Sequence, residues 1–406
     1  MSLAAAHILG IGAVTPLGRT WSESLTALSA GRGAVATVRS FDATGYPSTV
    51  AAAVDFALDD ALDRRLTLLR PAMAEAVRDA KLELATIDPS RIGVFIGAES
   101  GRAPLPIVQK LCAAAGGAAT FDHQLFGGSA VSVAQEQPAF SLLMSPAAVA
   151  EAIAVEYGAA GPVQTFSLAC ASSAAALVEA VRAIRLGRCD VALCGGVGAD
   201  VDPLMLAGFG KLGALSSRGE SCPFDVRRDG FVVGEGAAAV VLSKKPHGAV
   251  AAIVGAGRTL DAYHLTAPDP EGAGAERAMR AALAEAGLTA CDCVQAHGTS
   301  TPLNDAVEAS ALRRVFGAAL DGASVSSVKG AVGHWVAGAG ALGLVCAYEA
   351  VRSGTVLPTC GLVEPDARCD LPHVRDRAKL RTVGSALVNA FAFGGANCSL
   401  VVRRCD

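Results

Sequence analysis

The chain has 406 residues, of which 52% are hydrophobic and 18% are charged, and its formal net charge is −4. A chain of this length can form one large domain or two medium ones around a well-buried core. The small negative charge argues against general nucleic-acid binding. No run of about 20 apolar residues indicates a membrane span, and the N-terminus lacks the pattern of a secretory signal, so we expect a cytoplasmic protein that binds neither nucleic acid nor membrane.

Two halves of the chain show the same order of predicted elements. Each half is predicted to contain a buried strand, a helix, a second strand, an apolar strand that leads into a helix of small residues, and a closing strand. These elements are residues 6–14, 69–82, 91–97, 163–186 and 237–243 in the first half, and residues 249–257, 275–288, 293–297, 325–352 and 385–402 in the second.

This repetition predicts a duplicated α/β unit of about 200 residues. Alternating strands and helices imply largely parallel sheets covered by helices. Small residues at 171–176 and 337–343 indicate two helices packed closely in the middle. We divide the chain into residues 1–245 and 246–406, which are expected to share one core. In the less regular residues 99–160 we expect loops and helices that shape a pocket or a dimer contact.

Cys170 lies where a predicted strand turns into a helix, within the sequence SLACASS (residues 167–173). A cysteine attacks as its thiolate. A helix N-terminus contributes about half a positive charge and unpaired N–H groups, which lower a thiol pKa and can bind an oxyanion. Twelve cysteines occur without a Cys-x-x-Cys pair, so we expect no metal site. Two alternatives remain for Cys170, a nucleophile or a buried structural thiol.

Two histidines occur in glycine-containing motifs of the second half. His297 begins HGTST (residues 297–301), directly after a predicted strand, where α/β sheets place ligands. Thr299 and Thr301 alternate along this motif, so both hydroxyls are expected to point into one cavity. His334 precedes the small-residue helix. A catalytic role is one alternative for these histidines, and a structural role is the other.

Lys329 lies five residues before His334. We expect it either to form a salt bridge with Glu308 or Asp305 or to take a direct part in the chemistry. Near the C-terminus, Phe393 is followed by two glycines. Such a turn lets backbone amides approach a ligand without obstruction by a Cβ atom, so the Phe393 amide is a candidate oxyanion donor.

These motifs resemble those of the β-ketoacyl synthases of the thiolase superfamily, close to the discrete elongating ketosynthases of bacterial fatty-acid and type II polyketide synthesis. The resemblance runs essentially from end to end. The residues that carry it are GIGAVTPLG (10–18), ACASS (169–173), PFD (223–225), RDGFVVGEG (228–236), HGTSTP (297–302), Lys329, Gly333, His334 and FAFGG (391–395).

The resemblance implies a thiolase-like, five-layered αβαβα fold and a ping-pong reaction. Cys170 would take an acyl chain from the phosphopantetheine thioester of an acyl carrier protein. His297 and His334 would then stabilise the enolate formed when a malonyl thioester loses carbon dioxide. The amides of Cys170 and Phe393 would bind the oxyanion. No permanently bound cofactor is implied, because the phosphopantetheine arrives on the carrier protein.

The resemblance also implies roles for neighbouring residues. Lys329 would belong to the catalytic set. Thr299 and Thr301 would bind the pantetheine amides, Phe393 would be an aromatic gate, and Phe224 an aromatic wall. The structural residues near the site would be Asp305, Glu308, Gly394 and Gly395.

Three positions depart from the fatty-acid members of this family. Asn304 replaces a glycine before Asp305, Gly343 replaces a glutamate, and Ala392 replaces a glycine between two phenylalanines. The first two are similar to polyketide members, so we favour secondary-metabolite synthesis. The alternatives are a housekeeping fatty-acid elongation enzyme and a subunit that is active only with a chain-length-factor partner.

Partners are implied as well. Carrier proteins are acidic, so a docking site should be basic, and Arg64, Arg65 and Arg70 are candidates; the alternative for them is a solvated surface. The family implies a homodimer or a heterodimer with a ketosynthase-like chain-length factor. A thiolase is an alternative interpretation, in which Cys398 would be the second cysteine of the reaction. A role in the core explains Cys398 more simply.

Overall fold

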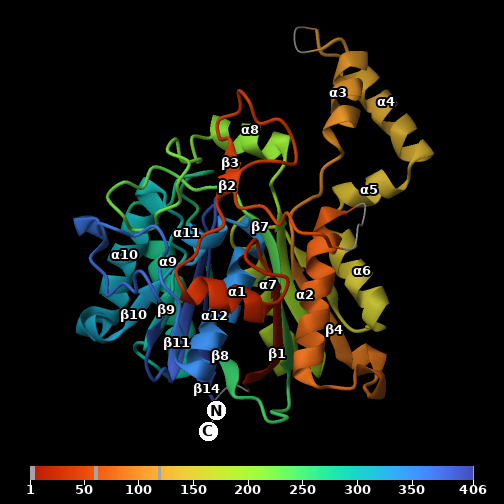
Figure 1. Cartoon of the computed structure of the whole chain (residues 1–406). Coiled ribbons are helices and arrows are strands. Elements are labelled where there is room, and N and C mark those ends of the chain that lie inside the picture. The colour runs from red at the N-terminus through yellow and green to blue at the C-terminus, as the bar shows by residue number, and fades with distance from the viewer. Residues whose placement is uncertain (1–4, 59–62, 118–119, 406) are drawn as a thin grey trace.

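The computed structural model describes residues 5–58, 63–117 and 120–405 (Figure 1). Ten strands form one sheet in the order β10-β9-β13-β14-β8-β1-β7-β6-β4-β5. The two central strands pair only through Ala6–Ile8 and Ala251–Ile253, so the sheet consists of two five-stranded parts. The first part contains β1 (Ala6–Val14), β4 (Ile92–Gly97), β5 (Val163–Phe166), β6 (Val191–Ala199) and β7 (Glu235–Ser243), and the second contains β8 (Ala251–Leu260), β9 (Cys293–Gln295), β10 (Ser324–Ser326), β13 (Ser385–Phe391) and β14 (Ala396–Arg404).

The two parts of the sheet have the same pairing pattern. In the first part, β7 is antiparallel to β1 and β6, whereas β4 is parallel to β6 and β5. In the second, β14 is antiparallel to β8 and β13, whereas β9 is parallel to β13 and β10. This confirms the predicted duplication. The prediction of largely parallel sheets is wrong, because each part mixes both kinds of pairing.

The reason for this error lies in how the strands are buried. Along β7, Ala237, Ala239 and Val241 face an outer core. Ala238, Val240 and Leu242 face a middle core. Because successive side chains point to opposite faces and both faces are covered, the strand is apolar throughout. Such a run is typical of parallel sheets, but here the helix layers impose it on antiparallel strands too.

Five layers follow from the helix contacts, which confirms the predicted αβαβα fold. α2 (Arg64–Ala80) covers the outer face of β1, β6 and β7, and α9 (Ala273–Ala286) covers β8 and β14 with α10 (Pro302–Phe316) beside it. α7 (Ser172–Arg185) and α12 (Ala339–Ser353) form the middle layer, and α12 contacts strands of both parts. The division between residues 245 and 246 remains a prediction.

The middle helices touch near their first turns. A Cβ atom on Gly340 would lie 2.8 Å from the Ala174 backbone nitrogen and 2.9 Å from the Ala174 Cβ. The Ala341 amide donates a hydrogen bond to the Ser173 hydroxyl at 3.0 Å. The predicted close packing of small residues is therefore confirmed. It brings the segments that precede both helices to one place.

The described residues of the range 99–160 form helices and connecting loops, as expected. Helix α2 before them begins at Arg64 rather than Leu69, because the Asp63 side chain accepts a hydrogen bond from the Arg65 amide and caps the helix. Figure 1 shows α3 and α4 standing away from the body. The helices of this region are α3 (Leu105–Ala114), α4 (His123–Glu136), α5 (Ala139–Met144) and α6 (Ala147–Tyr157).

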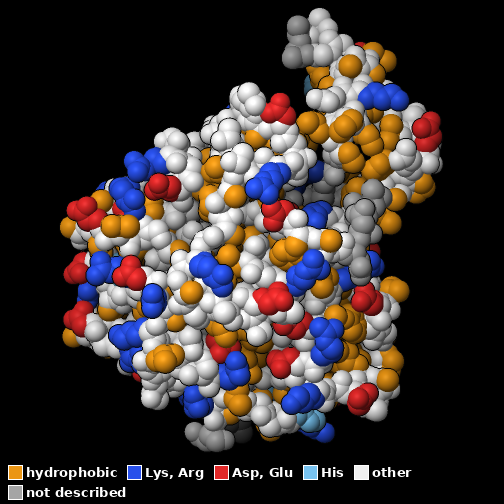
Figure 2. Space-filling view, viewed as in Figure 1, with side chains coloured by type: hydrophobic (Ala, Val, Ile, Leu, Met, Phe, Trp, Pro, Cys, Tyr) orange, Lys and Arg blue, Asp and Glu red, His pale blue; other side chains and the backbone are white. Residues whose placement is uncertain are grey.

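The projecting helices carry exposed apolar side chains. Figure 2 shows hydrophobic side chains gathered over this part of the molecule. Those exposed on or beside α4 and α5 are Phe121, Leu125, Val131, Leu142 and Met144. Within the described ranges, no helix is both long enough and apolar enough to cross a membrane. The remaining elements are α1 (Trp21–Ser29), β2 (Ala36–Thr37), β3 (Val50–Ala51), α8 (Pro203–Lys211), α11 (Lys329–Val332), β11 (Thr355–Val356) and β12 (Lys379–Leu380).

The contact between α7 and α12 predicts a sharp difference between two glycine substitutions. Gly340→Ala places a methyl group against the Ala174 backbone and should lower the free energy of unfolding by about 1–3 kcal/mol. Gly208→Ala on α8 meets open space and should raise it by about 0.5–1 kcal/mol. Urea unfolding followed by circular dichroism measures both. Equal effects would contradict the close packing.

Candidate active site

A strained turn presents Cys170 between β5 and α7. The residue before it, Ala169, has a φ of 46°, in the left-handed region that non-glycine residues rarely adopt. Ser172 at the start of α7 holds this turn: its hydroxyl accepts from the Leu168 amide at 2.8 Å and donates to the Ala169 carbonyl at 2.6 Å. Cys170 is buried. Its thiol therefore has a fixed position beside the N-terminus of α7.

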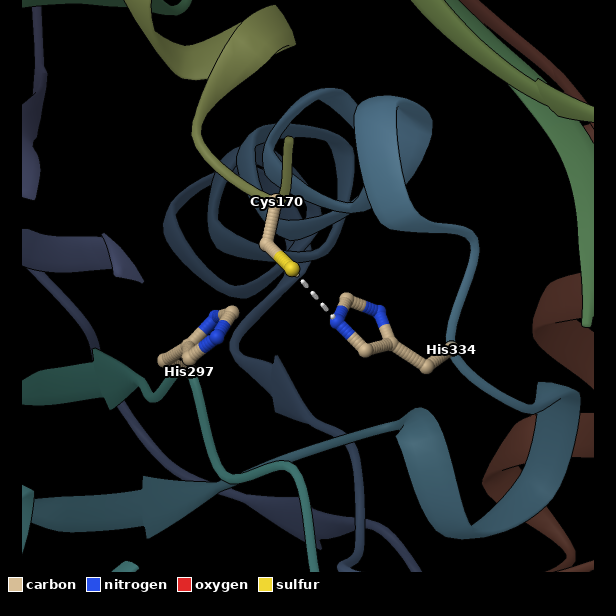
Figure 3. A group of neighbouring side chains, drawn as sticks. All are labelled: Cys170, His297 and His334. Carbon is tan, nitrogen blue, oxygen red and sulfur yellow. Dashed lines mark hydrogen bonds between the residues drawn. The ribbon is translucent and has the colours of Figure 1, made fainter. Parts of the chain in front are cut away.

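Cys170, His297 and His334 lie together, as predicted (Figure 3). His334 Nε2 is 3.0 Å from Cys170 Sγ. The two imidazole rings have centroids 5.6 Å apart and are nearly perpendicular, at 80°. One ligand atom from each of the three residues lies within 4.8 Å of the others. The two halves of the chain thus contribute to a single cluster.

The tautomer of His334 follows from its backbone contact. Its Nδ1 accepts a hydrogen bond from the Val336 amide at 3.3 Å, which leaves the proton on Nε2. Burial, followed by the charge of Lys329, lowers the pKa of His334 well below its ordinary value. His334 is therefore a neutral imidazole that donates an N–H toward the Cys170 sulfur.

His297 is held through its backbone. Its amide donates to Glu308 Oε1 at 2.8 Å, and its carbonyl accepts from Lys329 Nζ. Its buried Nδ1 has no hydrogen-bond partner among the described residues. Burial, Lys329 and His334 lower the pKa of His297 well below its ordinary value. This arrangement leaves a neutral ring with a polar atom available to a ligand.

Glu308 organises the start of the HGTST loop. Its carboxylate accepts from the amides of His297 and Gly298, each at 2.8 Å, and from the Asn389 side chain at 3.0 Å. Burial raises the pKa of Glu308 despite these donors. Removing the carboxylate would leave buried amides unpaired, at about 1–3 kcal/mol each.

Asp305 organises the rest of the loop. It accepts from the amides of Thr299 at 2.9 Å and Ser300 at 3.1 Å, and from the Phe224 amide at 2.8 Å. The side chain of Asn304 also donates to it, at 3.1 Å. The departure at Asn304 therefore supplies an extra donor to this buried carboxylate.

Of the two alternatives for Lys329, the salt bridge with Glu308 or Asp305 does not form. Neither Glu308 nor Asp305 lies within ion-pair distance, and among the described residues Lys329 has no ion pair; its amine instead donates to the His297 carbonyl. Burial lowers the pKa of Lys329, with Glu308 the largest opposing influence. A cysteine and two histidines can also ligate zinc, but the Lys329 charge, which acts on all three groups, opposes a divalent cation there.

The predicted direction of the pKa shift of the Cys170 thiol is wrong. Burial raises the pKa of Cys170 to about 12, although Lys329 and the backbone amide of Phe393 act to lower it. A thiolate without solvent is costly, and the helix terminus and one lysine do not offset that cost. Cys170 is therefore a thiol at rest.

The other predicted residues surround this cluster. The hydroxyls of Thr299 and Thr301 are 2.9 Å apart and face the same side, as expected. Phe393 is half-buried and packs against the apolar side chains around Cys170. Gly394 and Gly395 have φ values of 83° and 76°, so this turn requires glycine.

Phe224 lies outside the immediate cluster. It is fully buried, and its ring packs on His373 with centroids 5.0 Å apart. The rings that contact the histidines are instead Phe231, 5.1 Å from His334, and Phe391, 5.8 Å from His297. Neither of these contacts is predicted from the sequence. Both residues occur in the quoted motifs, which was the available signal.

Cys170 belongs to an apolar cluster, and a cavity lies beside this cluster. The cluster contains Cys170 with Leu206, Phe209, Leu215, Phe231 and Val336, among others. A cavity of about 1420 Å³ lies beside it and shares Ala51 with the cluster, while Glu99 and Arg102 line another wall. None of the three clustered site residues lines this cavity.

The predicted docking arginines differ in their surroundings. Arg65 is buried, and its guanidinium bonds Asp63 and the carbonyls of Leu143, Glu99 and Ser145. The prediction that Arg65 contacts a carrier protein is therefore wrong. Arg64 and Arg70 are exposed and pair with Glu235 at 2.5 Å and Glu156 at 3.1 Å.

The structure also places the other two departures from the fatty-acid members, Gly343 and Ala392. Gly343 is buried, and a Cβ atom there would lie 3.1 Å from a Val388 methyl carbon. A longer side chain would require Val388 to move. Ala392 pairs with Ala396 through its amide, and its side chain lies against the cluster around Cys170.

Comparisons with known proteins agree on one family. Residues 6–247 match the family model described as "Beta-ketoacyl synthase, N-terminal domain", and residues 250–363 match "Beta-ketoacyl synthase, C-terminal domain". The chain is 35% identical, over 421 residues and 98% of each chain, to a Coxiella burnetii protein named 3-oxoacyl-(acyl-carrier-protein) synthase 2.

Solved structures show the same fold. One of them is AntDE:AntF, described as a type II PKS acyl-carrier protein in complex with its ketosynthase bound to the hexaketide. A chain of that structure matches this chain with a TM-score of 0.85 at 27% identity, and the match covers 99% of this chain and 100% of that one. The ishigamide ketosynthase/chain length factor structure gives a TM-score of 0.85 at 28% identity and covers all of both chains.

The neutral histidines predict a pH dependence of stability. The unfolded chain protonates each histidine as the pH falls through about 6.5, whereas the folded chain does not, so stability is lost at lower pH. Between pH 7.5 and 5.5 the expected loss in free energy of unfolding is about 1.4 kcal/mol per histidine.

His334→Gln should reduce this loss by about 1.4 kcal/mol, whereas Leu380→Ala, at an exposed and non-titratable position on β12, should not change it. Urea unfolding at the two pH values measures the difference. A loss in His334→Gln as large as in the wild type would mean that this ring is protonated in the folded protein.

Proposed function

The chain belongs to the β-ketoacyl synthase family and is an acyltransferase that forms carbon–carbon bonds, and on that premise we propose that it condenses an acyl chain on Cys170 with malonyl-acyl carrier protein. The observation that carries this proposal is the contact of Cys170 Sγ with a neutral imidazole N–H at 3.0 Å, with a second neutral imidazole beside it. A nucleophile and two uncharged donors are the groups that such a condensation needs.

In the first half-reaction, Cys170 attacks the acyl thioester of a carrier phosphopantetheine. A carbon–sulfur bond forms to Cys170, the bond to the carrier sulfur breaks, and the thiol proton passes in net terms to the leaving carrier thiol. The amides of Cys170 and Phe393 bind the oxyanion of the tetrahedral intermediate. A hydrogen bond from the Phe393 amide acts to lower the pKa of the Cys170 thiol, which supports placing this amide in the oxyanion site.

In the second half-reaction, a malonyl-carrier thioester binds with its carbonyl oxygen near His297 and His334. The bond to the carboxylate breaks, carbon dioxide leaves, and the electron pair forms an enolate. N–H donors from the two imidazoles stabilise the enolate oxygen. The enolate carbon then attacks the acyl-Cys170 thioester and expels the Cys170 thiolate, which gives a β-ketoacyl carrier lengthened by two carbons.

Lys329 acts on this chemistry through its charge. It lowers the pKa of both histidines and of Cys170, and so favours neutral donors and an ionised sulfur. The paired hydroxyls of Thr299 and Thr301 are suited to bind pantetheine amides. Phe393 serves as the aromatic gate beside the nucleophile. Phe224, which is fully buried outside the immediate cluster, serves as an aromatic wall of the wider site.

We place the reaction in polyketide or other secondary-metabolite synthesis. The residues at positions 304 and 343 support this placement, as do the type II PKS structures with similar folds. The relative from Coxiella burnetii supports the alternative, fatty-acid elongation. Assays with carrier-bound saturated and β-keto acyl chains of several lengths distinguish the two.

A second chain of the same fold is the expected partner besides the carrier protein. β5 is an edge strand, and Gln164 Oε1 and Thr165 Oγ1 on it are buried without partners among the described residues. The exposed apolar side chains of the projecting helices also favour a covering chain. The partner is either a second copy or a chain-length factor, which native mass spectrometry of the purified complex distinguishes. Arg64 and Arg70 remain the candidates for carrier docking.

The two half-reactions predict different effects of two substitutions. Cys170→Ala should abolish acyl transfer to the protein, because no other described thiol lies beside the histidines. His334→Gln should still accept the acyl chain but should lower carbon dioxide release by about 100-fold or more. Intact-protein mass spectrometry and carbon dioxide release from malonyl-carrier protein measure the two steps.

An acyl adduct on Cys170→Ala equal to that of the wild type would contradict the role of this cysteine. Release of carbon dioxide by His334→Gln at the wild-type rate would contradict the role of the histidine. The variant Leu380→Ala, in which an exposed side chain on β12 is shortened, is the control for both measurements.

A further inference from the structure

The carboxylate of Glu99 supports the turn that carries Cys170. Glu99 follows β4, whose carboxyl end points toward this turn, since β4 pairs in parallel with β5 through Gly97 and Phe166. Glu99 Oε2 accepts from the Ser167 hydroxyl at 2.6 Å, and Oε1 accepts from the Ala169 amide at 2.9 Å. These contacts hold Ala169, which has a left-handed φ and directly precedes the nucleophile Cys170.

A third polar group of the turn faces the same carboxylate. The Ser172 hydroxyl is 3.1 Å from Glu99 Oε1 and 2.6 Å from the Ala169 carbonyl. Its single proton can serve one of these acceptors at a time. Glu99 is thus bonded to, or in hydrogen-bond reach of, the residues on both sides of Cys170.

The backbone around Glu99 is fixed in turn. Arg65 donates to the Glu99 carbonyl at 2.7 Å, and Arg102 bonds Asp200 at 3.0 Å and the Ala199 carbonyl at 2.6 Å. Both guanidinium groups belong to ion pairs with little exposure. The carboxylate of Glu99 therefore extends from a rigid segment, and its position does not depend on a flexible loop.

We propose that Glu99 is a positioning residue of this enzyme, whose carboxylate holds the turn from Ser167 to Ser172 so that Cys170 faces His334. This inference rests on the proposed function, because it assigns Glu99 to the nucleophile named there. The hydrogen bonds of the Glu99 carboxylate within the described residues go to the turn and not to the reacting sulfur. The carboxylate acts through the Ala169 amide and the Ser167 hydroxyl.

The same carboxylate also contributes charge near the sulfur. The charged and titratable groups that face Cys170 are Lys329, His297, His334, Glu99 and Asp200. Burial is the main reason that the pKa of Cys170 is raised; Lys329 opposes this rise, whereas Glu99 and Asp200 add to it. A neutral side chain at position 99 would remove one of the two negative charges that disfavour the thiolate.

Three substitutions separate the two effects of Glu99. Glu99→Gln keeps an oxygen for the Ala169 amide and removes the charge. Glu99→Asp keeps the charge but shortens the reach. Glu99→Ala removes both. Glu151→Gln, at an exposed site on α6, is the matched control. The readouts are condensation rate and the rate of Cys170 alkylation by iodoacetamide against pH, quantified on the Cys170 peptide.

Alkylation of Glu99→Gln at pH 8 should be roughly threefold faster than in the wild type, with the profile moved to lower pH. Its condensation rate should stay within about threefold. Glu99→Ala and Glu99→Asp should lose condensation by about tenfold or more, because the turn is no longer held in place. The conservative glutamine thus rescues the alanine variant.

Wild-type condensation in Glu99→Ala would overturn the proposal. An alkylation profile of Glu99→Ala identical to that of Glu99→Gln would overturn it too, since both variants lack the charge and only the glutamine keeps an acceptor for the Ala169 amide. Alkylation requires no carrier protein, so the comparison of alkylation profiles tests the role of Glu99 even if the proposed condensation is wrong.

Discussion

The close approach of α7 and α12 is the constraint on which the active site depends. Each helix begins just after a segment that carries a functional residue, Cys170 before α7 and His334 before α12. Gly340 and Ala174 leave no room for a larger side chain between the first turns of these helices. Because the segments that precede the helices converge with them, groups 164 residues apart in the chain reach hydrogen-bond distance.

Burial at this meeting point determines the charge states. Desolvation makes the histidines neutral and keeps the resting cysteine as a thiol. In the proposed reaction, the two histidines are therefore uncharged donors for the enolate, and the sulfur ionises only as its proton leaves. The buried carboxylates of Glu308 and Asp305 accept hydrogen bonds from the backbone of the HGTST loop and keep the loop rigid. Lys329 supplies positive charge and has no ion pair within the part of the chain that the structure describes.

Much of this arrangement could be predicted from the sequence, because motifs and internal repetition report local structure. The duplicated halves, the small-residue helices and the clustering of Cys170 with His297 and His334 were all predictable. The strand directions were not, because helices on both faces make antiparallel β7 as apolar as a parallel strand. The burial of Arg65 and the support from Glu99 depend on contacts between distant segments, which no periodicity records. The thiol pKa was predicted in the wrong direction because the sequence shows the helix terminus but not the depth of burial.

The hydrogen bond between His334 Nε2 and Cys170 Sγ is the central claim, and nitrogen NMR of histidine-labelled protein tests it most directly. The spectrum of the wild type, with His334 assigned by comparison with His334→Gln, should show a neutral ring protonated on Nε2 from pH 5.5 to 8. Its signal should shift when Cys170 is alkylated. A His334 ring that titrates near pH 6.5 and does not respond to alkylation of Cys170 would contradict this account.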